Sequence, residues 1–291
     1  MKRLFLLLIL FMSCDNNSDD GIVIPEPPQK LLNSISFDDE TNIDSLFYEK
    51  GRLVLKKEYV GSDFVDYNTF YTRNDTGQLL KVSYMHSSST DPSFVKDYTY
   101  YTNGNLKTIN RSASYTYDIS NQYFSYQGSQ ILIRVNNEQE ASIIANLDSK
   151  NRIKEVLFKK SSSNAFYKGK QYFYNEAGNA YKIIVQSSEH ANIVEYNYEF
   201  DNAENPYLSL DTDLPNGLTL NVVESLAFHD NYWEPREYHL PFFSKNNVVK
   251  YFTSNSSSDY YYTYTYNEDN YPIGIKYENF FNKPTLLLDY K

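Results

Sequence analysis

The sequence contains one cysteine, Cys14, among its 291 residues. A chain with a single thiol forms no internal disulfide, so a disulfide scaffold is excluded and stability must come from the core. The sequence also contains no G-x-S-x-G, H-E-x-x-H, P-loop or dinucleotide-binding pattern. These absences leave no familiar catalytic or nucleotide-binding motif, and we expect no enzyme activity and no cofactor.

Positive charge is also scarce. The chain has 27 Lys and Arg against 37 Asp and Glu, for a formal net charge of −10. Its basic residues are scattered, whereas proteins that bind the nucleic-acid backbone cluster them. We therefore expect no nucleic-acid partner, and the charges are typical of a soluble surface.

The N-terminus has the pattern of a lipoprotein signal. Lys2 and Arg3 precede an apolar run, Leu4 to Met12, that is too short to span a bilayer, and Ser13 precedes Cys14. The pattern predicts a signal peptide over residues 1–13 and lipid attachment at Cys14. An ordinary signal peptide with a chance cysteine, or an uncleaved anchor helix, are the alternatives.

Residues 15–20, "DNNSDD", resemble the acidic stretch that directs lipoproteins of Bacteroidetes-type bacteria to the outer face of the outer membrane. This resemblance implies a lipid-anchored protein of the outer membrane that faces the cell exterior. Residues 14–30, with three prolines in "GIVIPEPPQK", are predicted to form a flexible tether. A coil of this length reaches roughly 20 to 25 Å from the membrane.

After the signal peptide, the apolar residues show no convincing helical spacing. The sequence there has a weak repeat of about 25 residues instead. Each copy has a Tyr-rich arm, a polar turn and a second arm, as in "YFYNEAGNAYKII". The predicted turn residues are Gly51, Gly77, Gly104, Gly128, Asn151 and Gly178, with later copies near Asn205, Asn247 and Asn270. Glycine and asparagine both tolerate the positive φ that tight hairpin turns require.

The arms read as strands because residues of one kind alternate in them. In "SDYYYTYTYN", Tyr260 and Tyr262 fall on one face, and Tyr261 and Thr263 on the other. We predict an all-β domain over residues 31–291, in which repeated antiparallel hairpins form a meander of roughly 14–18 strands rolled toward a barrel. The tyrosines are expected to pack the core and to pair across strands.

The pattern "Y-x-Y-N-x-x-G-N-x-x-K-I" at residues 172–183 resembles a degenerate YD repeat, the unit of large secreted β-shell proteins. The stretches "FDNAENPY", "LPFFSKNNVV" and "YTYNEDNYP" resemble Bacteroidetes surface lipoproteins of unknown function with a porin-like fold. The resemblance implies a large antiparallel sheet rolled toward a barrel, and it implies no activity. A membrane channel is disfavoured by the lipid anchor, the "LLLDYK" ending and the polar residues that interrupt the arms.

The repeat is interrupted by an insertion at about residues 207–245, and its segment 227–243 is the candidate binding site. Tyr232, Trp233 and Tyr238 offer flat rings to a sugar or a protein surface, next to His229 and Glu234. The alternative is that this segment is only a longer connection between strands, which Trp233 packs over the end of the barrel.

Other chemical readings of this segment and of the rest of the chain are weaker. A metal site at His229 and His239 matches no established ligand spacing, and we expect no metal. Glycosidic chemistry at Asp38 and Asp39 is disfavoured because acidic pairs in loops are usually solvated. His86 and His190 are expected to be solvated loop residues.

The sequence therefore favours a non-enzymatic surface lipoprotein that binds a glycan or a protein. The alternatives are an envelope scaffold that assembles through a Tyr-rich sheet edge or face, and a carbohydrate-active enzyme.

Overall fold

The computed structural model describes residues 31–37, 42–60, 64–113, 121–160, 162–186, 193–206, 244–254, 259–278 and 285–290. They form one antiparallel sheet of 18 strands, and no α-helix occurs within these ranges. Nothing helical in this described part is long and apolar enough to cross a bilayer. The strands are β1 Leu32–Phe37, β2 Asn42–Glu49, β3 Arg52–Val60, β4 Phe64–Arg73, β5 Leu79–His86, β6 Phe94–Tyr100, β7 Leu106–Ala113, β8 Gln122–Gln127, β9 Gln130–Val135, β10 Ile143–Leu147, β11 Ile153–Lys159, β12 Phe166–Tyr174, β13 Ala180–Gln186, β14 Ile193–Glu204, β15 Asn246–Thr253, β16 Tyr260–Tyr266, β17 Pro272–Glu278 and β18 Leu286–Tyr290.

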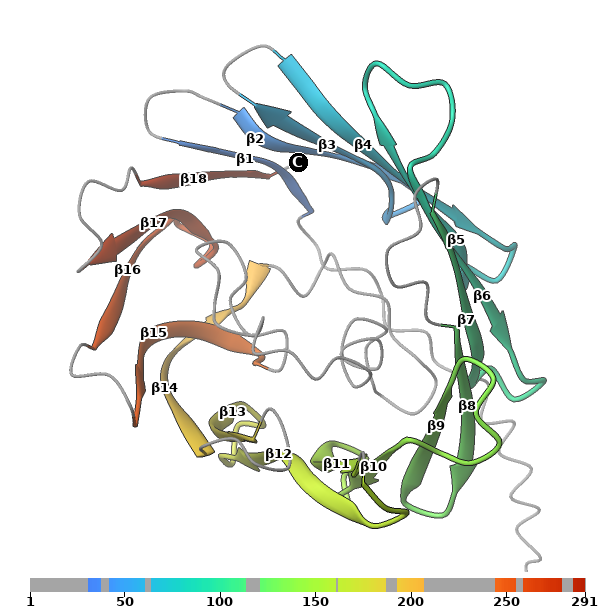
Figure 1. Ribbon diagram of the computed structural model, residues 1–291. Coiled ribbons are helices and arrows are strands. Elements are labelled where there is room, and N and C mark those ends of the chain that lie inside the picture. Colours follow the sequence, from blue (N-terminus) through green and yellow to red (C-terminus); the bar gives the residue numbers. More distant parts are fainter. Residues whose placement is uncertain are drawn as a thin grey trace, which may run out of the picture.

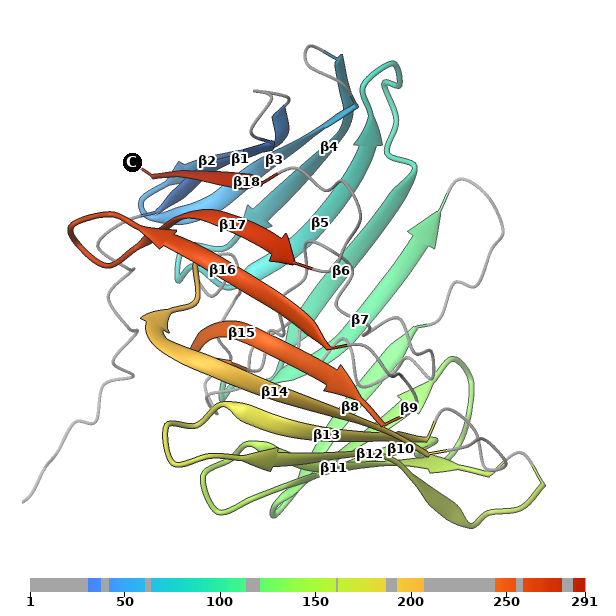
Figure 2. The same ribbon diagram turned by 90° about the vertical axis from the view of Figure 1, so that its left-hand side faces the viewer.

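The sheet closes into a barrel. Each strand pairs with its neighbours in the chain, and β1 pairs with both β2 and β18, which joins the two ends of the meander (Figure 1). In the side view the strands run obliquely between the two rims (Figure 2). The all-β prediction is confirmed, and closure leaves no free sheet edge among the described strands.

Four of the hairpin turns are built on an asparagine or an aspartate. In the hairpin that joins β12 to β13, the Oδ1 atom of Asn175 accepts a hydrogen bond of 2.9 Å from the backbone N–H of Asn179. Gly178 between them adopts a φ of 94°. The same bond recurs from Gln78 to Asn74, from Arg152 to Asp148 and from Tyr271 to Asn267. In these four hairpins a side chain therefore fixes the turn.

The glycine and asparagine positions confirm most of the predicted turns. Positive φ angles are found at Gly51, Gly77, Gly104, Gly128, Asn151, Gly178 and Asn270. Asn205 and Asn247 differ, because neither is among the residues with positive φ. Both are buried and hydrogen-bonded through their side chains, so the residue type at these positions serves a polar network and not a left-handed turn.

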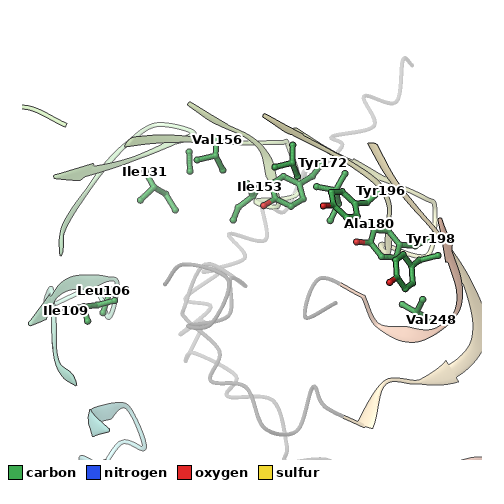
Figure 3. Close-up of a cluster of buried hydrophobic side chains, with 14 of the residues drawn as sticks. Leu106, Ile109, Ile131, Ile153, Val156, Tyr172, Ala180, Tyr196, Tyr198 and Val248 are labelled. Atoms are coloured by element: carbon green, nitrogen blue, oxygen red, sulfur yellow. The ribbon is translucent and has the colours of Figure 1, made fainter. Parts of the chain in front are cut away.

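The core lies on the inward face of the barrel. Ile131, Tyr172 and Tyr198 point from the strands toward the inside of the ring (Figure 3), and each is buried. Adjacent strands continue this apolar surface, since Tyr172 is paired with Ile183 and Ile183 with Tyr196. The expectation that tyrosines pack the core is confirmed on this wall.

The outward face of the wall between β13 and β16 carries ion pairs. Neighbours along a strand point to opposite faces, so Lys182, which precedes the buried Ile183, points outward. Its Nζ atom lies 2.7 Å from the carboxylate of Glu195 on the next strand. Lys250 likewise lies 3.6 Å from Glu199 and 2.9 Å from Asp259. The outer surface of this part of the wall is therefore suited to contact with water, whereas its inner surface is hydrophobic.

Candidate functional site

The residues predicted for lipid attachment and for binding lie outside the described residues. They are Cys14 for the lipid, and His229, Tyr232, Trp233, Glu234 and Tyr238 for the ligand. The predicted signal peptide, the tether and the acidic pair Asp38 and Asp39 also lie outside them. The structure does describe the base of the insertion, where the chain leaves β14 and enters β15.

The two ends of the insertion are held together by buried asparagine. Asn205 is 1% exposed, its backbone N–H donates to the carbonyl of Lys245 at 2.9 Å, and its Nδ2 atom donates to the carbonyl of Ser244 at 3.3 Å. Ser244 is also 1% exposed. Because these amides are satisfied inside the protein, residues 207–243 begin and end at a fixed base.

The neighbouring hairpin reinforces this base. The Oδ1 atom of Asn179 accepts from the backbone N–H groups of Lys245 and Asn246, at 2.7 and 3.2 Å. Its Nδ2 atom donates to the Oδ1 atom of Asn246 at 2.8 Å. Asn179 follows Gly178 in the β12–β13 turn, so one residue serves its own turn and the base of the insertion. The only signal of this role in the sequence is an asparagine directly after a turn glycine.

A carboxylate completes the network. Asp201 accepts hydrogen bonds from the backbone N–H of Ala203 and of Asn247 and from the hydroxyl of Tyr266. Burial, together with the hydrogen bond and the charge of Asp201, raises the pKa of the Tyr266 phenol. Tyr266 thus remains a proton donor to Asp201 at neutral pH, which ties β16 to the base of the insertion.

A second polar cluster lies on the inward face of β2 and β3. The Nζ atom of Lys56 lies 3.2 Å from the carboxylate of Asp44 and 2.8 Å from that of Glu58. Burial raises the pKa of Asp44 against the opposing effect of Lys56, while Lys56 has a raised pKa because the two carboxylates outweigh its own burial. The three side chains therefore form an ion-paired group on this part of the wall.

His86 was predicted to lie in a loop, and the structure places it elsewhere. His86 is the last residue of β5 and not a loop residue, and its Nε2 atom lies 3.1 Å from the carboxylate of Asp66. The ring also makes an edge contact with Tyr67. Among the residues that the structure describes, no group of three or more His, Cys, Asp or Glu is arranged for a metal.

Several solved structures match this chain over most of its length. A porin-like protein from Bacteroides vulgatus matches with a TM-score of 0.35 and 11% identity, covering 90% of this chain and 99% of that one. A porin-like protein from Bacteroides uniformis matches with a TM-score of 0.26 and 9% identity, covering 89% and 97%. A structure described as TcdB2-TccC3-Cdc42 matches with a TM-score of 0.33 and 12% identity, covering 87% of this chain and 14% of that one. No protein-family model and no curated protein matches the sequence.

Proposed function

We propose that this chain is a non-enzymatic lipoprotein of the outer membrane, anchored by lipid on Cys14 and facing the cell exterior, whose barrel presents residues 227–243 to a glycan or a protein. The observation that carries this proposal is the fixed base of the insertion. Loops that bind ligands are commonly carried by a rigid scaffold, and the bonds of Asn179 and Asn205 hold the two described ends of the insertion, at residues 205 and 244–245, on a closed barrel.

The polarity of the wall supports a body that stands in water. A membrane-spanning barrel has an apolar outer band and a polar interior. Here the wall between β13 and β16 has ion pairs on its outside, such as Lys182 with Glu195, and buried tyrosines on its inside. A lipid at the end of a tether then supplies the attachment to the membrane that such a surface does not supply.

Binding is tested with the protein lacking residues 1–30, whose single tryptophan is Trp233. A panel of host and microbial polysaccharides is titrated while fluorescence and acrylamide quenching are recorded. We expect acrylamide to quench Trp233 strongly and the emission of Trp233 to shift when a ligand is added. Affinity electrophoresis should show that Trp233→Ala no longer binds the ligand. Phe173→Ala is the matched control, because it removes a ring that is 37% exposed on the outward face of β12. The proposal would be overturned if acrylamide did not quench Trp233 and if the protein bound no polysaccharide and no protein from a cell extract.

Anchoring is tested separately in cells. A lipid analogue should label the wild-type chain and not Cys14→Ser, and protease added to intact cells should digest the wild-type chain. A Cys14→Ser variant that stays membrane-bound, or a chain that is protected from external protease, would contradict the proposed location.

A scaffold is the second candidate function, and an outward aromatic row favours it. Phe47 and Phe70 are 41% and 38% exposed, and both are paired with Leu55 of the strand between them. Because the described strands leave no free edge, assembly would use this face. Concentration-dependent self-association that is abolished by Phe47→Ser with Phe70→Ser would support the scaffold over the binding protein.

A further inference from the structure

Two tyrosines lie face to face on the inner wall. Tyr251 of β15 and Tyr260 of β16 are directly paired across the two strands, so their side chains point to the same face of the sheet. Their ring centroids are 4.5 Å apart, and their planes are 7° from parallel. Both rings extend from paired residues in the same direction, so this stack brings the carbon atoms beside the two hydroxyls close together.

Neighbouring tyrosines are not stacked as closely. The ring of Tyr198 lies 6.2 Å from that of Tyr251, with an angle of 29° between the planes. The ring of Tyr262 lies 6.1 Å from that of Tyr251, with an angle of 27°. Both pairs are further apart and more tilted than the pair of Tyr251 and Tyr260. A reaction that needs two ring faces in contact is therefore favoured at this pair.

The two stacked rings lie at a short seam of the barrel. Among the described residues, β15 and β16 share two residue pairs, Lys250 with Tyr261 and Tyr251 with Tyr260, whereas β16 and β17 share six. On the outer side of this seam the Nζ atom of Lys250 lies 2.9 Å from the carboxylate of Asp259. Ion pairs at a surface contribute little stability and are screened by salt. A covalent bond between the two strands would therefore strengthen this seam.

We propose that Tyr251 and Tyr260 are a site of oxidative crosslinking, at which a one-electron oxidant joins the two rings as dityrosine. Each phenol loses one electron and one proton, which gives two phenoxyl radicals. The radicals form one carbon–carbon bond between the ring positions next to the oxygens. The hydrogen on each bonded carbon then moves as a proton to the ring oxygen, which restores two phenols. In total the protein loses two hydrogen atoms, and the oxidant takes up two electrons.

The surroundings of the two rings favour a bond within one molecule. Reacting groups that are already held in contact combine far faster than groups that must meet by diffusion. Tyr251 is 7% exposed, which hinders a second protein molecule from reaching its ring. Tyr260 is half-buried at the start of β16, so a proton released from this ring can reach water.

The crosslink would supply what the cysteine content denies. The chain has one cysteine and forms no internal disulfide. A bond between residues 251 and 260 closes a loop, and it restricts the unfolded chain in the way that a disulfide does. A carbon–carbon bond is also not reduced by thiols. The fold should therefore become more stable where an oxidant is present.

The experiment oxidises the purified full chain, at low concentration, with an illuminated ruthenium tris-bipyridyl complex and persulfate. We expect a monomeric product that has the blue fluorescence of dityrosine and has lost the mass of two hydrogen atoms. A protease that cleaves before aspartate cuts at Asp259, between the two tyrosines, so mass spectrometry should find the two resulting peptides joined. Tyr260→Phe keeps the ring and should abolish this product, as should Tyr251→Phe. Tyr261→Phe is the matched control, because it removes the hydroxyl of the next residue, which is 38% exposed, and it should give the product as wild type does.

Thermal unfolding measures the effect on stability. The crosslinked protein should unfold at a temperature about 5 °C or more above that of the untreated protein, and oxidised Tyr260→Phe should show no such rise. The crosslinking site would be overturned if dityrosine formed only between molecules, or if the joined peptides persisted in Tyr260→Phe and in Tyr251→Phe. An unchanged unfolding temperature of the crosslinked protein would overturn its stabilising role.

Discussion

The hydroxyl of Tyr174 donates a hydrogen bond of 2.8 Å to the carbonyl oxygen of Ile153, which joins the last residue of β12 to the first residue of β11. The same relationship links Tyr100 to Leu79 at 2.7 Å and Tyr290 to Pro272 at 2.7 Å. In each case the ring lies against the core while its hydroxyl satisfies a backbone group at the start of the preceding strand. A tyrosine at the end of an arm thereby fixes the position of its hairpin against the one before it.

Replacing Tyr174 with phenylalanine should therefore cost stability although the ring is kept. We expect Tyr174→Phe to lower the free energy of unfolding by about 1 kcal/mol, because the carbonyl of Ile153 loses its donor in a part-buried place. Chemical denaturation measures the change. Tyr181→Phe is the control, since Tyr181 is 42% exposed, and it should change stability by less than about 0.5 kcal/mol. Equal effects of the two substitutions would refute a specific role for the Tyr174 hydroxyl.

The sequence predicted the architecture because the signals for it are local. Alternation of side chains in "YYYTYTY" and left-handed turn residues such as Gly104 and Asn270 identify hairpins without knowledge of their neighbours. Closure through β1 and β18 depends on pairing between residues as distant as Ile35 and Leu288, which no local pattern encodes. The partner of each tyrosine hydroxyl is likewise a property of the assembled barrel.

On the inner wall, the Phe158 ring occupies the space that a side chain at Gly169 would need. A Cβ atom on Gly169 of β12 would fall within the ring of Phe158 on β11. Gly169→Ala should lower the free energy of unfolding by about 1 to 3 kcal/mol, since the ring must leave its position. Gly274→Ala is the matched control, because a Cβ atom there has its nearest neighbour at an ordinary 3.6 Å.

A double-mutant cycle tests whether the cost of Gly169→Ala arises from the ring itself. Phe158→Leu removes the atoms that the new methyl group meets, so the two substitutions together should cost less than the sum of their separate effects. Strict additivity would show that Gly169 is required for another reason, such as its backbone.

The ion-paired cluster of the inner wall makes a pH-dependent prediction. Lys56→Met leaves the carboxylates of Asp44 and Glu58 facing each other, and we expect a loss of about 2 kcal/mol at neutral pH, below the range for fully buried pairs because the group is partly exposed. Burial already raises the pKa of Asp44, and removal of Lys56 raises it further. Near pH 4 the folded variant therefore holds more protons than the wild type, and its stability deficit should shrink.

Lys57→Met is the control for this prediction. Lys57 is the next residue along β3 and points outward, where its Nζ atom lies 5.2 Å from the centroid of the Phe47 ring. Its replacement should change the free energy of unfolding by less than about 0.5 kcal/mol at either pH. A deficit of Lys56→Met that stays constant between neutral pH and pH 4 would refute the carboxylate explanation.

The insertion was predictable from the sequence, whereas the residues that hold its base were not. An insertion that breaks the repeat is visible as a long interval between turns, but its base depends on Asn179 from another hairpin, 66 residues from Lys245. The hydrogen bond from Arg52 to the Gly77 carbonyl is equally hidden, because the two residues lie 25 positions apart in the sequence and meet only when consecutive hairpins are side by side. The features that distinguish this barrel from a simple repeat of hairpins depend on contacts between repeats more than on patterns within each repeat.

The buried tyrosines predict an alkaline limit to the fold. Burial raises the pKa of Tyr172 and of Tyr198 above the usual value of about 10. Because the pKa is higher in the folded state than in the unfolded state, this contribution to stability is complete below about pH 10 and is lost as the pH rises beyond it. Phenolate absorbance should therefore show a late group of tyrosines that ionise together with the loss of near-ultraviolet circular dichroism. The variant with Tyr172→Phe and Tyr198→Phe should have a smaller late group, whereas ionisation of all tyrosines in a protein that keeps its native spectrum would contradict the buried arrangement.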